Sequence, residues 1–172
     1  MTPTIYRSAA DVGIDTSGLD NFGALGGIDA VTVHHSAGPR ATSKQKAKEL
    51  HRAYHRQHAN QGWQGIGYHW SMDDLGRFYR LRPIRFKGAH TGDYNTSNVG
   101  LMVHGNYEHD RLTRAQKRSL RWLFEGGFLV LTGEKESGIA LVRGHQEWPG
   151  PTNATACPGR HLMRQLRIER NR

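Results

Sequence analysis

The sequence is poor in cysteine, with one residue, Cys157, in 172. A single cysteine excludes a disulfide within the chain, so the fold must be held by its core, with or without help from a metal. No stretch approaches the roughly 20 consecutive apolar residues that a membrane helix needs. The N-terminus also lacks the apolar centre of a secretory signal. We therefore expect no integral membrane association and no export signal in this chain.

Acidic residues are scarce as well, since 15 Asp and Glu face 24 Lys and Arg and the formal charge is +9. Such a surface attracts polyanions at long range, among them nucleic acid, anionic membranes and bacterial walls. Part of the excess consists of arginines near the C-terminus: Arg160, Arg164, Arg167, Arg170 and Arg172. These fit a solvated helix face equally well. The basic and aromatic residues are not interleaved as in single-strand binders, so we expect no nucleic-acid partner.

Apolar residues make up only 36% of the chain, yet four Trp, six Tyr and five Phe supply large surfaces for a core. The length suits one domain, because single domains typically span about 100–200 residues. Residues 1–27 contain short polar and glycine-rich pieces and predict an irregular arm packed on the domain. Residues 28–172 are expected to form the domain itself.

Four segments have the composition of strands. Residues 28–35 are rich in β-branched side chains, which favours a buried strand, and the apolar run of residues 99–104 suits a central strand. Residues 68–81 predict a hairpin around the turn-like Asp73–Gly76 segment, and residues 139–145 predict a further strand. Helices between these strands would give an α/β fold with a mixed central β-sheet flanked by helices.

Three segments predict helices. Residues 43–60 follow a capping-box pair, Thr42 and Gln45. A second pair, Thr113 and Gln116, opens a helix whose apolar side chains would face the core: Leu120, Leu123, Phe124 and Phe128. Gly126 and Gly127 weaken the middle of that helix. Residues 160–168 predict a closing helix.

Two predicted strands end in histidine, at His34–His35 and at His145, and Cys157 follows twelve residues later in the loop PGPTNATACPG. Strand ends and adjoining loops can aim side chains into one cleft. Imidazole and thiolate are preferred zinc ligands, and three protein ligands leave a fourth tetrahedral position open. The spacing alone does not require a metal, because a lone cysteine and separate histidines are also common core residues.

A second histidine group lies in the first predicted helix, where His51, His55 and His58 recur at i, i+4 and i+7. Three imidazoles on one helix face could bind a metal. No glutamate accompanies them as in the HExxH motif. We therefore interpret them as a mostly solvated face, with His58 packed at the helix end.

Several segments together resemble a known family. They occur in that family's order: VTVHHSAG, a helix ending in His58, GWQGIGYHW, DDLGRFYRL, GAHTGDYNTSNVGLMVHGN, LTRAQ, VRGHQE and TACPG. The series, which covers about residues 28–166, resembles the zinc-dependent N-acetylmuramoyl-L-alanine amidases of the peptidoglycan recognition protein and phage lysozyme-type (type 2 amidase) superfamily. The resemblance implies that family's fold, with residues 28–172 as the catalytic amidase domain.

The resemblance also implies roles for individual residues. The zinc ligands would be His34, His145 and Cys157. Tyr68 and Thr155 match catalytic positions. The residues that match or adjoin the substrate groove are His90, Asn95 and His35, of which His35 is expected to support the site without ligating the ion. Glu147 is the carboxylate nearest in sequence to a ligand and is either a general base, a supporting partner or a surface charge.

The implied activity is hydrolysis of the amide between N-acetylmuramic acid and L-alanine in bacterial peptidoglycan, by a phage endolysin or its catalytic domain. We expect a monomer that is made in the host cytoplasm and acts on the bacterial cell wall. The alternative is a non-catalytic peptidoglycan-binding or regulatory module of the same fold. The presence of Cys157 favours catalysis, because many members of the family that only bind have lost it.

Overall fold

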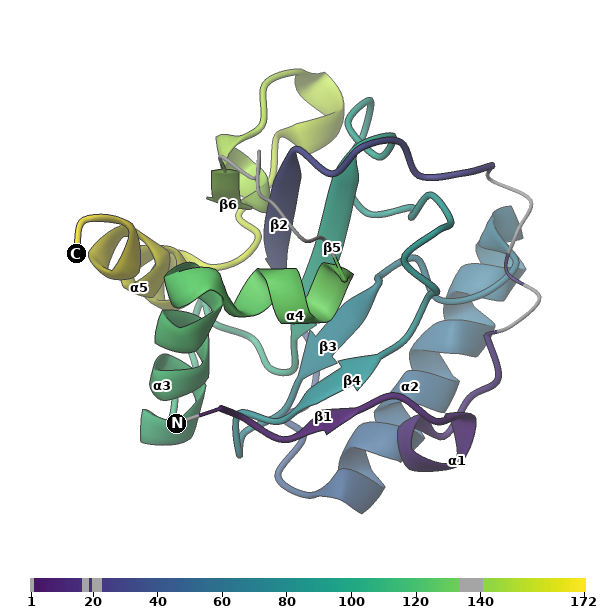
Figure 1. Cartoon of the computed structure of the whole chain (residues 1–172), viewed down its shortest axis with the longest axis horizontal. Helices are drawn as coiled ribbons and strands as arrows, with labels where there is room; N and C mark the ends of the chain where they lie inside the picture. Colours follow the sequence, from purple (N-terminus) through teal and green to yellow (C-terminus); the bar gives the residue numbers. More distant parts are fainter. Residues whose placement is uncertain (1, 17–18, 20–22, 134–140) are drawn as a thin grey trace.

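The computed structural model in Figure 1 describes residues 2–16, 19, 23–133 and 141–172. Within these residues, six strands form one mixed sheet in the order β1-β4-β3-β5-β2-β6. Their bounds are Ile5–Tyr6 (β1), Ala30–His35 (β2), Trp70–Met72 (β3), Phe78–Arg80 (β4), Asn98–Val103 (β5) and Leu141–Gly144 (β6). The predicted mixed sheet flanked by helices is confirmed.

The centre of the sheet is parallel. β2 pairs with β5 over six positions, from Ala30 opposite Asn98 to His35 opposite Val103, and with β6 over four. The exception is the predicted hairpin, in which β3 and β4 pair antiparallel. The carboxyl ends of β2 and β6 therefore lie side by side, which brings the histidines that end or follow these strands to the same edge of the sheet.

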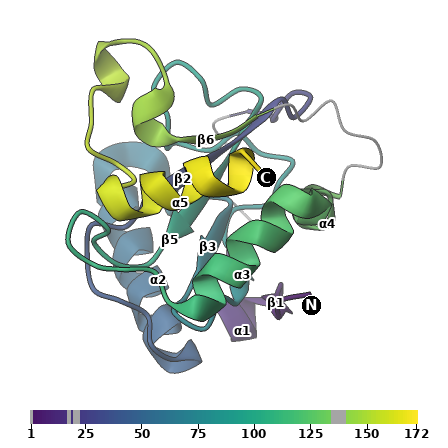
Figure 2. The same cartoon turned by 90° about the vertical axis from the view of Figure 1, so that its left-hand side faces the viewer.

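The helices cover both faces of the sheet (Figures 1 and 2). Their bounds are Ala9–Val12 (α1), Lys44–His58 (α2), Arg114–Trp122 (α3), Phe128–Thr132 (α4) and Arg160–Arg170 (α5). One apolar cluster joins β-strand residues such as Val33 and Leu101 to Leu120 of α3 and Leu162 of α5. The other joins Met102 of β5 to α1 and α2.

Alternation along β2 decides which side chains reach which face, because successive residues of a strand point to opposite sides. Val31 and Val33 belong to the cluster beneath α3 and α5. His34 consequently points to the α2 side, where polar and aromatic side chains as well as apolar ones cover the sheet. His35 points the other way and accepts a hydrogen bond on its Nδ1 from the Tyr107 backbone amide, at 3.2 Å.

The helix starts follow side-chain capping. Thr113 and Gln116 form the predicted capping box at the start of α3. At α2 the prediction was wrong by one residue, because Ser43 and not Thr42 accepts from the Lys46 amide. After α3 the backbone leaves helical geometry at Glu125 and Gly126, whose φ of 97° favours glycine, before α4 begins.

The N-terminal arm, expected to be irregular, contains regular structure. Ile5 and Tyr6 form β1, which extends the sheet beyond β4, and Ser8 caps the single turn of α1. A strand at the edge of a sheet pairs through its backbone groups, so a strand of two residues can form without a recognisable side-chain pattern. The predicted strand at 139–145 is observed as β6 from Leu141, and residues 139–140 lie outside the described part of the chain.

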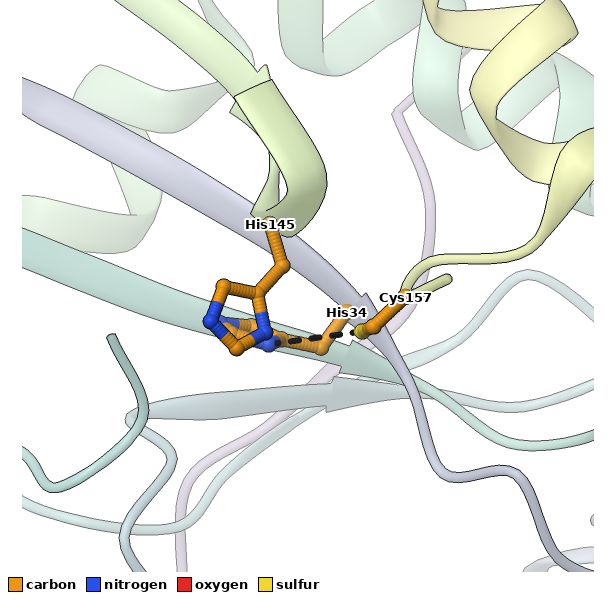
Figure 3. Close-up of side chains that lie close together, drawn as sticks. All are labelled: His34, His145 and Cys157. Carbon is orange, nitrogen blue, oxygen red and sulfur yellow. Dashed lines mark hydrogen bonds between the residues drawn. The ribbon is translucent and has the colours of Figure 1, made fainter. Parts of the chain in front are cut away.

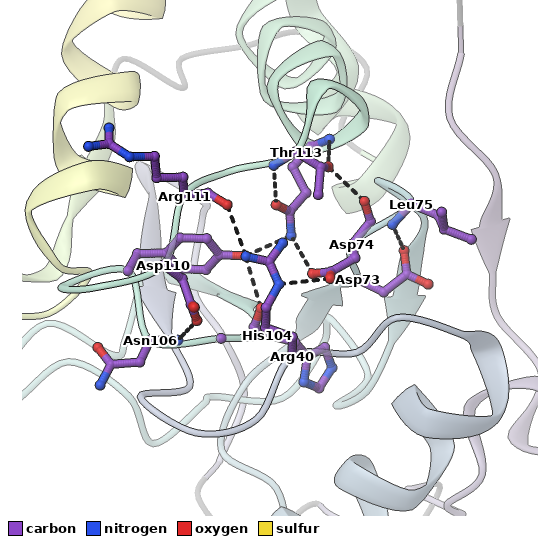
Figure 4. A network of polar contacts seen from close by, with 12 residues as sticks. Arg40, Asp73, Asp74, Leu75, His104, Asn106, Asp110, Arg111 and Thr113 are labelled. Carbon is purple, nitrogen blue, oxygen red and sulfur yellow. Dashed lines mark hydrogen bonds and ion pairs between the residues drawn. The ribbon is translucent and has the colours of Figure 1, made fainter.

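A polar network ties the β3–β4 turn to α3 (Figure 4). Asp74 accepts from Arg40 at 2.8 Å and from Gln116 at 3.3 Å. The Thr113 hydroxyl donates to the Asp74 carbonyl at 2.7 Å. Gln116 also donates to the hydroxyl of the buried Tyr107, at 2.7 Å. Because the partners are largely buried, the network fixes α3 relative to the hairpin.

The histidine face of α2 is packed, so the prediction of a mostly solvated face was wrong. His51 is fully buried, and its Nδ1 lies 2.8 Å from the Val12 carbonyl. His55 and His58 accept from the backbone amides of Ile66 and Gly67. The imidazoles satisfy buried backbone groups of neighbouring segments. These bonds give the three histidines a structural role.

Candidate metal centre and groove

His34, His145 and Cys157 converge although 123 residues separate the first from the last (Figure 3). One potential ligand atom from each residue lies within 4.8 Å of the other two. His34 comes from the end of β2, His145 directly follows β6, and Cys157 belongs to the loop before α5. Among the described residues this is the one group of three or more such side chains that could hold a metal ion.

The spacing suits tetrahedral zinc. Nitrogen and sulfur ligands about 2.0–2.3 Å from a tetrahedral zinc lie roughly 3.3–3.8 Å apart. His34 Nδ1 and Cys157 Sγ are 3.6 Å apart. Two nitrogens and one sulfur are a donor set that zinc prefers. The residues present therefore fit the ion.

The hydrogen bonds around His34 determine which ring nitrogen is free. His90 Nε2 lies 3.1 Å from the Asn98 carbonyl, which can only accept, so His90 carries its proton there. His90 Nδ1 is then an acceptor that faces both the Thr91 hydroxyl, at 2.9 Å, and His34 Nε2, at 3.2 Å, which favours a proton on His34 Nε2. Neutral His34 therefore has its lone pair on Nδ1, the atom that faces Cys157. A metal ligand needs this tautomer.

His145 is oriented in the same way by Asn153. The amide of Asn153 donates to the carbonyls of Gly92 and Pro149, at 3.0 and 2.9 Å, which fixes the direction of its oxygen. That oxygen lies 3.2 Å from His145 Nε2 and accepts its proton. Nδ1 of His145 is left unprotonated. Nothing in the sequence indicates Asn153, because its role depends on how two distant loops meet.

Burial controls the charge of the three residues. It lowers the pKa of His34 well below the usual value, and repulsion from His90 and His145 adds to this effect. Burial also raises the pKa of the Cys157 thiol to about 12, opposed by a hydrogen bond from the His35 backbone amide. Neutral imidazoles are ready to bind a cation, and a cation would stabilise the buried thiolate.

A groove of about 510 Å³ opens beside the three residues, and His145 forms part of its wall. Its lining is uncharged at neutral pH and rich in amide, hydroxyl and aromatic groups. The end of α2 and the segment after it contribute Gln57, His58, Gln61 and Trp63. The opposite side is formed by the loop of residues 89–95 and by Thr152. Such a lining suits a polar, largely neutral ligand.

Tyr68 lies in the groove next to His34, with ring centroids 5.1 Å apart. Burial raises its pKa, and the nearby Cys157 adds to the shift, so the phenol stays protonated and can donate. Thr155 is exposed, and its hydroxyl accepts from the Cys157 backbone amide at 3.1 Å. It braces the loop that carries Cys157 and is not among the residues that line the groove.

The other predicted groove residues divide into two groups. His90 and Asn95 line the groove. Asn95 also accepts from the backbone amides of His90 and Thr91, both at 3.0 Å, and so shapes the loop. His35 is not brought into the groove, because it points to the opposite face of the sheet.

Glu147 is engaged elsewhere. It accepts from the Gly144 amide and pairs with Arg170, each at 2.8 Å. Partial burial raises the pKa of its carboxyl, but the Arg170 and Gly144 hydrogen bonds outweigh burial and lower it. Glu147 is thus a partly exposed charge, one of the roles expected for it, and its ion pair with Arg170 holds the end of β6 to α5.

Comparison with known proteins identifies the family. Residues 25–160 match the N-acetylmuramoyl-L-alanine amidase family, and the chain belongs to it. Peptidoglycan-recognition protein SC2 of Drosophila simulans is 30% identical over 148 residues, which cover 84% of this chain and 75% of that protein. The region that matches the family, residues 25–160, includes the three converging residues and all residues that line the groove.

Solved structures share the fold. Bumblebee PGRP-SA superposes with a TM-score of 0.78 and 23% identity, covering 96% of this chain and 94% of that one. N-acetylmuramoyl-L-alanine amidase LysC from Clostridium intestinale gives 0.67 and 23%, covering 99% of both chains. The fold is thus that of peptidoglycan recognition proteins and amidases. No helix in the described part of the chain has the length and apolar character of a membrane span.

Proposed function

We propose that this chain is a zinc-dependent N-acetylmuramoyl-L-alanine amidase that hydrolyses the amide between N-acetylmuramic acid and L-alanine in bacterial peptidoglycan. The observation that carries the proposal is the convergence of His34, His145 and Cys157 beside an open groove. A purely structural metal site would use four protein ligands. Three donors, with the groove alongside, support a catalytic site.

His34 and His145, through Nδ1, and Cys157, through its sulfur, would hold the ion. Zinc at such a site acts as a Lewis acid and lowers the pKa of water to about 7, which makes a nucleophile available at neutral pH. His90 and Asn153 keep the two imidazoles in the required tautomer. Their hydrogen bonds therefore set the direction of the ligand lone pairs before any ion binds.

Tyr68 is suited to stabilise the transition state. When an amide carbonyl is attacked its oxygen becomes negative, and a donor already placed nearby stabilises that charge without reorganisation. The Tyr68 hydroxyl remains protonated and lies in the groove beside His34. Thr155 contributes by fixing the Cys157 loop, because its hydroxyl accepts from the Cys157 backbone amide. We propose that the same exposed hydroxyl also orients water or the substrate carbonyl.

We further propose that the chain acts as a phage endolysin or as its catalytic domain. The net charge of +9 favours approach to an anionic cell wall. Cytoplasmic synthesis in the host and action as a monomer are part of this proposal. Wall turbidity in the presence of the zinc-loaded protein measures lytic action directly.

The competing function is a binding module that recognises peptidoglycan without cutting it. The Drosophila relative is named as a peptidoglycan-recognition protein. Recognition without cleavage is therefore the function that an experiment must distinguish from amidase activity. The two functions differ in the metal, because binding in the groove alone needs neither zinc nor a free coordination position.

The deciding experiment uses purified walls and one protein in two states, zinc-loaded and treated with chelator. We expect new L-alanine N-termini with the zinc-loaded protein and none after chelation, with activity restored by added zinc. Walls that bind the zinc-loaded protein but release no L-alanine N-termini would reject the amidase and support the binding module.

A further inference from the structure

A second cavity, of about 260 Å³, lies beside the groove and has a different lining. It combines an aromatic pair, two carboxylates and two hydroxyls: Tyr94, Trp148, Asp29, Asp93, Thr96 and Ser97. None of these residues has a place in the metal centre or in the groove described above. The cavity therefore calls for an explanation of its own.

The same two loops build both cavities. In the loop of residues 91–97, Thr91, Gly92 and Asn95 line the groove, whereas Asp93, Tyr94, Thr96 and Ser97 line the second cavity. In the loop that follows β6, His145 and Thr152 face the groove and Trp148 faces the second cavity. A hydrogen bond of 3.2 Å from Thr152 to Asp93 joins the two loops. The cavities are thus neighbours across one shared ridge.

The aromatic pair is held in place before any ligand binds. Trp148 donates its indole proton to the Thr32 hydroxyl on β2, at 2.7 Å. The rings of Tyr94 and Trp148 lie 4.6 Å apart at an angle of 35°, and both side chains are half-buried. A rigid, partly exposed aromatic surface costs little side-chain entropy when a ligand packs on it.

The polar groups narrow the class of ligand. Carboxylates and hydroxyls accept hydrogen bonds from hydroxyl and amide groups, and aromatic faces attract C–H groups because the faces carry negative charge. The Arg143 guanidinium lies 4.8 Å from the Trp148 ring centroid and offsets part of the negative charge of the two carboxylates. This combination suits a neutral ring bearing hydroxyl and N-acetyl groups.

We propose that this cavity is a subsite for a neutral N-acetylhexosamine residue of the glycan strand, one that neighbours the muramic acid whose amide is cut. The inference rests on the proposed amidase function and extends it. A substrate with several sugars would then occupy the groove and the second cavity together, across the ridge of residues 91–97. A substrate with one sugar would occupy the groove alone.

The test compares two substrates that carry the same stem peptide, one on a single N-acetylmuramic acid and one on a tetrasaccharide of alternating N-acetylglucosamine and N-acetylmuramic acid. The variant is Tyr94→Ala in the zinc-loaded protein. We expect it to lower kcat/KM about tenfold for the tetrasaccharide, the effect of losing one aromatic contact. It should leave the single-sugar substrate unchanged.

Matched controls separate stacking from damage to the loop. Tyr94→Phe keeps the ring and should retain the parent preference, and Leu75→Ala changes an exposed side chain in the β3–β4 turn. Equal kcat/KM values for parent and Tyr94→Ala on both substrates would overturn the subsite. An equal loss on both substrates would also overturn it, because the loop would then serve the groove alone.

A binding measurement keeps this inference separable from the amidase proposal. Calorimetry with the peptide-free tetrasaccharide should show binding by the parent and weaker binding by Tyr94→Ala. Binding without release of L-alanine from either substrate would reject the amidase and keep the subsite. Tighter binding of the same glycan after its acetyl groups are removed would indicate a cation site and overturn the proposal.

Discussion

At the scale of single residues, Cys157 supplies the one sulfur among the three converging donors. Serine has nearly the same shape, but its hydroxyl is a far poorer zinc ligand than a thiolate. We expect Cys157→Ser to weaken zinc binding by more than the roughly 10–100-fold that loss of a supporting hydrogen bond costs. Amidase activity should disappear with it. Metal analysis and release of L-alanine N-termini measure both, and unchanged zinc content with the full rate would refute the ligand assignment.

Tyr68 should affect turnover and not the metal. Tyr68→Phe keeps the ring beside His34 and removes the donor that faces the groove. If the hydroxyl stabilises the developing negative charge, kcat falls by about 10²–10³, as when one oxyanion donor is removed. Zinc content should equal that of the parent. A rate close to the parental rate would show that another group stabilises the oxyanion.

Asn153 is a positioning residue for His145. Asn153→Ala removes the acceptor that holds the proton on Nε2 of His145. We expect zinc affinity to fall about 10–100-fold, the usual effect of losing such a partner. Asn153→Asp keeps an acceptor and should lose less, although it gives up the bonds to Gly92 and Pro149. Competition with a chromophoric chelator gives the affinities, and identical values for both variants would contradict this role.

The family resemblance predicts His34, His145 and Cys157 as a group, and the structure brings them together, whereas their spacing alone did not require a common site. The sequence does not predict that His34 donates to His90 and His145 to Asn153, because both bonds depend on the folded positions of loops and not on a local sequence pattern. His35 shows the same limit. The face of the sheet on which His35 lies depends on the register of β2. A shift of one residue would move its side chain from the core face to the groove face.

At the scale of secondary-structure elements, the start of α3 does two things at once. The Thr113 hydroxyl caps the helix by accepting from the Gln116 amide and also donates to the Asp74 carbonyl in the β3–β4 turn. Thr113→Ala removes both bonds. We expect a loss of about 1–2 kcal/mol in the free energy of unfolding. Urea denaturation measures it, and Thr113→Ser, which keeps the hydroxyl, should recover most of the loss.

Elements with strong local patterns were predictable, and elements defined by packing were not. The hairpin around Asp73–Gly76 and the capping box at Thr113 are encoded by adjacent residues. The burial of His51 on α2 is not, because its partners, Val12 and Ser71, come from α1 and β3. A polar helix face predicts exposure to solvent, and the sequence does not reveal that another segment of the chain covers it.

At the scale of the whole molecule, burying neutral histidines links folding to pH. His51 and His69 are both fully buried, and burial lowers the pKa of each to about 4. Hydrogen bonding to Val12 and the charge of Asp73 oppose the shift at His51. At His69 the Phe86 bond opposes it and Arg82 adds to it. Nδ1 of His69 accepts from the Gly100 amide, which protonation would prevent.

The sign of the pH effect follows from these shifts. In the unfolded chain each histidine takes up a proton near pH 6.5, but the folded protein resists protonation until about pH 4. Between these values the unfolded state binds more protons, so stability falls as pH falls. Each histidine contributes at most about 1.4 kcal/mol per pH unit over this window. Above about pH 7.5 both are neutral in either state and contribute no slope.

Urea denaturation of the metal-free protein at several pH values between 7.5 and 4.5 tests this prediction, since removing zinc separates the effect from proton competition at His34 and His145. We expect stability to be constant near pH 7.5 and to fall steadily below pH 6.5. His51→Gln cannot take up that proton, so its slope should be smaller than the parental slope by up to about 1.4 kcal/mol per pH unit. Equal slopes in parent and variant would mean that His51 takes up a proton as readily in the folded protein as in the unfolded chain, which would contradict the prediction.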